Sequence, residues 1–118
     1  MAFMLRPIAQ AREDMLAMAD EHGQVGWRTL DQRVNRLIRA LRATGLAPGD
    51  RIALHAGNSR ATYELMAAAQ HCGLSYVPVN WHFTADELAH VLADSGARGL
   101  FTDSEHAPVA AEALARVP

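Results

Sequence analysis

Six histidines and one cysteine are the side chains of this sequence best suited to ligate a metal or to act as a base or nucleophile. The histidines are His22, His55, His71, His82, His90 and His106. No two of them have the i, i+4 spacing that places both rings on one helical face, and the zinc patterns H-E-x-x-H and C-x-x-C are absent. Asp86 and His90 are four residues apart, but we interpret them as a solvated helix face. The sequence therefore predicts no metal site.

Two nucleophile candidates are also better interpreted as structural residues. Cys72 follows His71, but neighbouring residues on a helix point about 100° apart, so we expect Cys72 in the core. Ser59 lies in the sequence G-N-S-R, which lacks the G-x-S-x-G frame of a nucleophile elbow, and Asn58 or Ser59 is expected to cap a helix. The backbone amides at that helix start, helped by Arg60, could also hold an anion. No catalytic residue is predicted.

Composition excludes several classes of protein. All eleven basic residues are arginine, so these residues offer no amine nucleophile, no Schiff-base lysine and no Walker lysine. A formal net charge of -2 excludes a strongly basic nucleic-acid binder, and 50% hydrophobic residues exclude a disordered chain. No apolar run approaches the ~18 residues of a membrane span, and charge enters too early for a signal peptide. The lone cysteine favours a reducing cytoplasm.

Hydrophobic periodicity predicts alternating helices and strands. A helix over 29–44 has an apolar stripe opposite an arginine face, which we interpret as solvated, with a docking surface as the alternative. Capping boxes are predicted at Thr29 with Gln32 and at Thr84 with Glu87. The stripe is Leu30, Val34, Leu37, Ile38 and Leu41, and the face is Arg36, Arg39 and Arg42. Further helices are expected over about 59–72, 84–95 and 109–116. Strands are expected over 51–56, 75–79 and 98–102. Residues 15–19 and 25–28 are expected to form a hairpin, which an opening helix precedes.

Three strands separated by two helices predict an α/β fold with βαβαβ connectivity and a parallel sheet. Such a sheet is small, and both of its faces need cover, so we expect an incomplete N-terminal subdomain of a larger fold. Trp81 is expected in the loop at the carboxyl end of a strand, where open α/β sheets bind ligands. Otherwise both tryptophans are interpreted as packing residues, and these residues alone assemble no active site.

Three segments in order resemble a known family. The segment W-R-T-L at 27–30 looks like a first core motif, G-L-A-P-G-D-R-I-A-L at 45–54 like a turn and strand, and G-L-S-Y-V-P-V-N at 73–80 like a second core motif. T-A-D-E-L follows at 84–88. Together they resemble the N-terminal part of the adenylate-forming acyl-CoA synthetases, the AMP-dependent synthetases and ligases. The bacterial fatty-acyl synthetases are the most similar in appearance.

The resemblance implies a ligase that uses ATP and Mg²⁺ to convert a carboxylic or fatty acid to an acyl-adenylate, which coenzyme A then captures as a thioester. It implies that residues 1–118 are an N-terminal fragment of the large AMP-binding domain, without the C-terminal domain, and that their partner is the remainder of the ligase. The phosphate loop and catalytic lysine of the family are not in this sequence. The fragment itself is therefore expected to be inactive and to bind no cofactor well.

One site residue is carried over by the resemblance. His82, in N-W-H, stands where some members have an arginine that approaches the nucleotide phosphate of coenzyme A. The alternative to the ligase is a stand-alone small α/β module that binds or scaffolds without catalysis. A receiver-like domain is disfavoured because no acidic pair follows the first parallel strand and lysine is absent. The sequence predicts neither the acyl chain length nor the oligomeric state.

Overall fold

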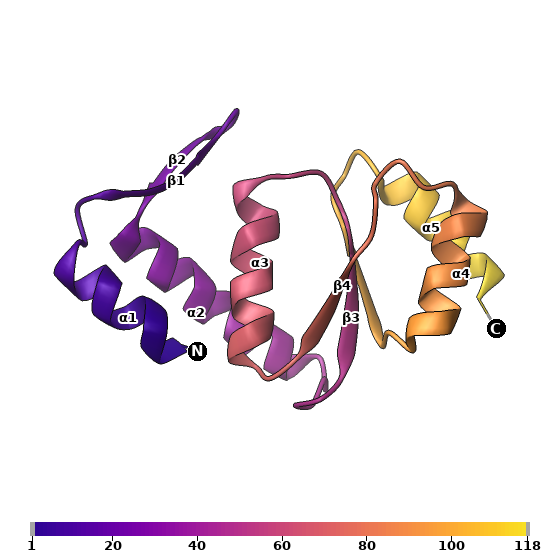
Figure 1. Ribbon diagram of the computed structural model, residues 1–118, viewed down its shortest axis with the longest axis horizontal. Helices are drawn as coiled ribbons and strands as arrows, with labels where there is room; N and C mark the ends of the chain where they lie inside the picture. The colour runs from indigo at the N-terminus through magenta and orange to yellow at the C-terminus, as the bar shows by residue number, and fades with distance from the viewer. Residues whose placement is uncertain (1, 118) are drawn as a thin grey trace. The chain divides into compact units, whose positions relative to one another are not determined.

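A computed structural model, drawn in Figure 1, describes residues 2–117, with side chains from residue 5 onward. The chain divides into two compact units. The first unit comprises the residues up to Pro48 together with 58–73, and the second comprises 49–57 and the residues from Leu74. The first unit contains α1 (Ala2–Ala11), β1 (Leu16–Asp20), β2 (Gly23–Gly26), α2 (Trp27–Ala43) and α3 (Arg60–His71). The second contains β3 (Arg51–His55), β4 (Ser75–Pro78), α4 (Ala85–Ser95), β5 (Gly99–Thr102) and α5 (Ala107–Arg116).

Helix α2 is the centre of the first unit and packs against both α1 and α3. The predicted apolar stripe is confirmed, since Leu30, Val34, Ile38 and Leu41 are buried and Leu37 is partly buried. The predicted arginine face is exposed. These four buried side chains remove most of their apolar surface from water, which is the main source of stability for such a helix.

The start of α2 differs from the prediction. The helix begins at Trp27 with Gly26 as N-cap and without a side-chain cap, so the expected capping box of Thr29 is wrong. Strand β2 runs directly into the helix, and the amides of Trp27 and Arg28 donate to the carbonyls of Met15 and Glu13. Those backbone carbonyls satisfy amides that a capping side chain would otherwise serve.

The predicted hairpin is confirmed, with a tighter turn. Strands β1 and β2 pair antiparallel with Asp20 opposite Gly23, so only Glu21 and His22 form the turn. Asp20 Oδ1 accepts a hydrogen bond from the amide of His22 at 2.9 Å, which closes the turn through a side chain.

The second unit contains the predicted parallel sheet, in the order β4-β3-β5. Strand β3 is central and buried from Ile52 to His55, as its continuous apolar run indicates. Pro78 ends the edge strand β4, where the missing amide breaks no ladder. The parallel sheet and its alternation with helices confirm the α/β prediction.

Helices α4 and α5 lie on the same face of this sheet and pack against each other (Figure 1). Their shared core contains Ala53 of β3 and the fully buried Leu88 of α4. The capping box of Thr84 and Glu87 is confirmed, and Gly96 ends α4 in the left-handed conformation at φ 67°. Across residues 2–117, no helix is long and apolar enough to cross a membrane.

Candidate functional site

The carboxyl ends of the three parallel strands bring the polar and aromatic side chains of the second unit together. Strand β3 ends at His55, β4 leads into Asn80–Phe83, and β5 leads into Asp103 and His106. Because parallel strands point the same way, these ends share one edge of the sheet, which we call the carboxyl edge. Open α/β sheets bind ligands at this edge.

Asp103 joins two of the loops at the carboxyl edge. Its Oδ2 accepts the amide of Gly57 at 2.9 Å, and its Oδ1 accepts the amide of His106 at 2.9 Å and lies 2.5 Å from His106 Nδ1. Burial raises the pKa of Asp103, but hydrogen bonds from Gly57 and His106 outweigh it and hold the pKa below its ordinary value of 3.8. Asp103 is therefore an anion at neutral pH, and His106 Nδ1 carries the shared proton.

His55 is the buried ring of the site. Its side chain is 0% exposed, and neither ring nitrogen has a hydrogen-bond partner within the described residues. Burial first, and the charge of His106 second, lower the pKa of His55 below 6.5, against an opposing effect of Asp103. The imidazole is therefore neutral at pH 7. Two buried nitrogens without partners lower the free energy of unfolding, so a histidine is an unusual residue at this position of a central strand.

Trp81 and His82 form the exposed part of the site. Their rings stack with centroids 3.5 Å apart, and Trp81 is 42% exposed. Asn80 Oδ1 accepts the amide of His82 at 3.0 Å and lies 2.9 Å from His82 Nδ1, so this nitrogen carries a proton in that hydrogen bond. The other nitrogen, Nε2, remains for a ligand. The end of β4 at Pro78 confirms that Trp81 lies in the loop at the carboxyl end of a strand, whereas the ligand of His82 remains a prediction.

The rings form one continuous series across the carboxyl edge. His106 lies 5.7 Å from the His55 ring in a T-shaped arrangement and 5.1 Å from the Trp81 ring. The arrangement offers an aromatic surface and, on the exposed His82, one ring nitrogen without a partner among the described residues. Within residues 2–117 no group of three His, Cys, Asp or Glu side chains is placed to hold a metal ion. The edge is suited to bind and orient a ligand.

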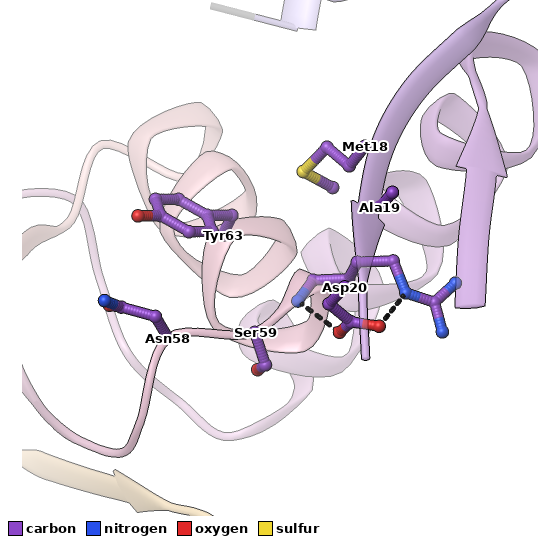
Figure 2. Close-up of a pocket in the computed structure, with 7 residues that line it drawn as sticks. Met18, Ala19, Asp20, Asn58, Ser59 and Tyr63 are labelled. Carbon is purple, nitrogen blue, oxygen red and sulfur yellow. Dashed lines mark hydrogen bonds and ion pairs between the residues drawn. The ribbon is translucent and has the colours of Figure 1, made fainter. Parts of the chain in front are cut away.

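A pocket of about 370 Å³ lies in the first unit, between β1 and the start of α3 (Figure 2). Met18 points toward α3, and Tyr63 contributes a half-exposed ring. Asp20 lies at the polar end of the pocket, where it accepts hydrogen bonds from the backbone amide and the Nε of Arg60, both at 3.0 Å. These hydrogen bonds, that of the backbone amide first, lower the pKa of Asp20 below 3.8 against the effect of burial.

The predicted anion site at the start of α3 is therefore occupied by the protein itself. The Asp20 carboxylate takes the place of an external anion on the Arg60 amide, and Ser59 caps the helix by accepting the amide of Thr62 at 3.2 Å. Asp20 and Arg60 are forty residues apart, so no local pattern indicates their pairing. The cap at Ser59 is confirmed, and its role as a nucleophile gains no support.

The other predicted residues have structural surroundings. Cys72 is partly buried, less than expected, and its Sγ lies 3.8 Å from the carbonyl oxygen of Ile38. Asp86 and His90 are exposed, as predicted, and Arg116 of α5 donates to Asp86. Asp103 and His106 were not predicted as site residues. Their signal is positional, because both follow a strand of the sheet within a few residues.

Comparison with known proteins finds one family model, described as AMP-binding enzyme, that matches residues 5–118. A feruloyl-CoA synthase from an Amycolatopsis species is 41% identical over 95% of this chain and 24% of its own length. A fatty acid–[acyl-carrier-protein] ligase from Streptomyces coeruleorubidus is 39% identical over 93% of this chain and 21% of its own length.

A solved structure supports the same comparison. A benzoate CoA ligase from Burkholderia xenovorans LB400 superposes on 97% of this chain and 23% of its own, with a TM-score of 0.91 and 25% sequence identity. The chain thus spans between about a fifth and a quarter of the length of these proteins.

Proposed function

Since the match over residues 5–118 shows that this chain belongs to the AMP-binding enzyme family, we propose that it is the N-terminal portion of an acid–thiol ligase. Residues 1–118 form part of the large AMP-binding domain in this proposal. The observation that carries it is the agreement of sequence and fold with ligases over nearly the whole chain. The lone Cys72 supports a cytoplasmic location.

The proposed reaction has two steps. A carboxylate, of a fatty or an aromatic acid, attacks the α-phosphorus of ATP, which forms an acyl-adenylate and releases pyrophosphate. A thiol then attacks the acyl carbon and AMP leaves, so a poor acyl donor has become a thioester. These residues contain no lysine, and in this proposal other parts of the ligase bind ATP and Mg²⁺.

Expression of the complete coding sequence tests this proposal. We expect pyrophosphate exchange into ATP that depends on an added carboxylic acid, and thioester formation when a thiol is supplied. A panel of fatty and aromatic acids identifies the substrate class. A coding sequence that ends at Pro118, or a full product without acid-dependent exchange, would contradict the ligase and favour the non-catalytic module.

The acceptor thiol has two candidates. Feruloyl-CoA synthase names coenzyme A in its product, whereas the Streptomyces coeruleorubidus ligase names an acyl carrier protein. We favour coenzyme A, because Nδ1 of the exposed His82 is bound to Asn80, which leaves Nε2 for a ligand beside an exposed indole ring. Protonated at this nitrogen, the imidazole donates a charge-assisted hydrogen bond to a phosphate. A histidine binds phosphate less firmly than the two-pronged guanidinium of arginine.

Dephospho-coenzyme A, which lacks the 3′-phosphate, tests the role of His82. We expect the ligase to prefer coenzyme A, and we expect His82→Ala to reduce that preference by about tenfold, the worth of one charged hydrogen bond. His90→Ala removes an exposed histidine from α4 and is the matched control. An unchanged preference in His82→Ala would show that His82 does not contact this phosphate.

A further inference from the structure

The loop that carries Trp81 and His82 is exposed, yet its rings have a defined arrangement. Within the loop, Asn80 holds the amide and the Nδ1 of His82, and the amide of Phe83 donates to the carbonyl of Asn80 at 3.0 Å. These bonds fix His82 relative to its own loop. The ends of the loop are tied to the sheet, because the amide of Val79 donates to the carbonyl of Leu54 at 2.9 Å and Phe83 packs against the core that contains Ala53. The exposed Trp81 ring between these ends needs a side-chain contact of its own.

His106 supplies such a contact. Its ring lies 5.1 Å from the Trp81 ring at an interplanar angle of 54°, and its side chain is 11% exposed. It also meets the buried His55 ring of β3 in a T-shaped arrangement, at 5.7 Å. The His106 ring thus contacts both the central strand and the indole.

Asp103 in turn fixes the orientation of the His106 ring. Its Oδ1 receives both the amide and the Nδ1 of His106, and its Oδ2 receives the amide of Gly57. A ring that is hydrogen-bonded through Nδ1 and in contact with two other rings has little rotational freedom. The Asp103 carboxylate therefore holds the His106 ring in one orientation, and the contacts of that ring with His55 and Trp81 depend on it.

We propose that His106 is a positioning residue that holds Trp81, and through Trp81 the Nε2 of His82, in place at the carboxyl edge. The consequence for coenzyme A rests on the proposed function, in which His82 contacts a phosphate. His106 itself touches no substrate in this proposal. It lowers the cost of ordering the loop when the ligand binds.

Two substitutions separate the hydrogen bond of His106 from its ring. The amide of His106→Asn can donate to Asp103 in place of Nδ1 but presents no ring to Trp81. His106→Phe keeps a ring but loses the bond to Asp103. We expect the asparagine variant to show the larger effect on Trp81 and the phenylalanine variant to show a smaller one.

Fluorescence of Trp81 tests the proposal without any ligand. Among residues 1–118, Trp27→Phe leaves Trp81 as the sole tryptophan, and any tryptophan elsewhere in the complete ligase is replaced by phenylalanine in the same background. We expect His106→Asn to shift the Trp81 emission to longer wavelength and to lower its anisotropy, with His106→Phe between it and the parent. Unchanged emission and anisotropy in a folded His106→Asn variant would overturn the inference.

Kinetics of the complete ligase test the consequence. We expect His106→Asn to raise the KM for coenzyme A about three- to tenfold, the range that an aromatic contact is worth, with kcat and the KM for ATP unchanged. An unchanged KM for coenzyme A, where His82→Ala does alter it, would refute the positioning role. If His82→Ala leaves the coenzyme preference intact while Trp81 fluorescence still responds to His106, the proposed phosphate contact fails and the ring coupling stands.

Discussion

The pocket beside α3 and the carboxyl edge of the sheet differ in whether their polar groups already have partners. In the pocket, the Asp20 carboxylate saturates the amide and Nε of Arg60. At the carboxyl edge, neither ring nitrogen of His55 has a partner within residues 2–117, and Asn80 binds only one of the two ring nitrogens of His82. The charged groups at the polar end of the pocket thus already bind each other, whereas at the edge of the second unit the exposed His82 has a ring nitrogen without a partner among the described residues. A cavity alone does not identify a binding site.

The two units also differ in formal charge. Eight of the eleven arginines lie in the first unit with six acidic residues, whereas the second has three arginines and seven acidic residues. In the first unit, Arg33 Nε lies 2.8 Å from Oε1 of Glu64, whose side chain is 2% exposed. Internal ion pairs thus take up part of the positive charge of the first unit.

The Arg33–Glu64 pair gives the largest expected effect. Arg33→Ala leaves the Glu64 carboxylate buried without its cation. We expect the free energy of unfolding to fall by about 2 to 3 kcal/mol, which is less than for a fully buried pair because Arg33 is half exposed. Urea unfolding measures it. Arg36→Ala, one turn along α2 on the exposed face, is the control and should change stability by less than about 0.5 kcal/mol. Equal effects would refute the importance of the pair.

Asp103 gives the next effect, in the second unit. Asp103→Asn weakens three hydrogen bonds of a partly exposed carboxylate, so we expect a loss of about 1.5 kcal/mol at pH 7. Because folding lowers the pKa of Asp103, the wild-type advantage is complete above about pH 4 and is lost as the pH falls through the lowered pKa. Unfolding measured from pH 7 to 3 checks this, with exposed Asp94→Asn as control.

His55→Phe gives the smallest effect, with the opposite sign. It removes two unpaired buried nitrogens, so we expect a gain of about 1 kcal/mol at pH 7, limited by the larger ring. Folding lowers the pKa of His55, so the wild type loses stability as the pH falls below about 6.5, and the variant should not. Destabilisation by His55→Phe at pH 7 would contradict the unpaired state. His90→Phe controls for an exposed ring.

Local patterns predicted most elements to within a few residues, because periodicity and glycine positions depend only on neighbours in the chain. The strand at β3, the cap at Ser59 and the capping box at Thr84 are examples. The start of α2 was misplaced because its first amides bind carbonyls that precede β1. A local pattern cannot locate a helix start whose amides are bound by backbone carbonyls of another segment and not by a capping side chain.

The candidate site was predicted only in part for the same reason. Trp81 was placed at the carboxyl edge because a loop after a strand is a local feature. Asp103 binds Gly57 across forty-six residues, and His55 meets His106 across the sheet, so neither contact has a sequence signal. At Arg60 the local pattern correctly predicted an anion, but it did not show that the anion is Asp20 of the same chain.

Hydrogen–deuterium exchange of the complete ligase, with and without saturating coenzyme A, tests most directly whether ligands bind at the carboxyl edge. Slower exchange is expected in residues 80–83 and 102–106, with little change in the pocket residues 18–20 and 58–63. Protection confined to the pocket residues, with the loop at Trp81 and His82 unaffected, would contradict the assignment of the carboxyl edge as the ligand-binding side.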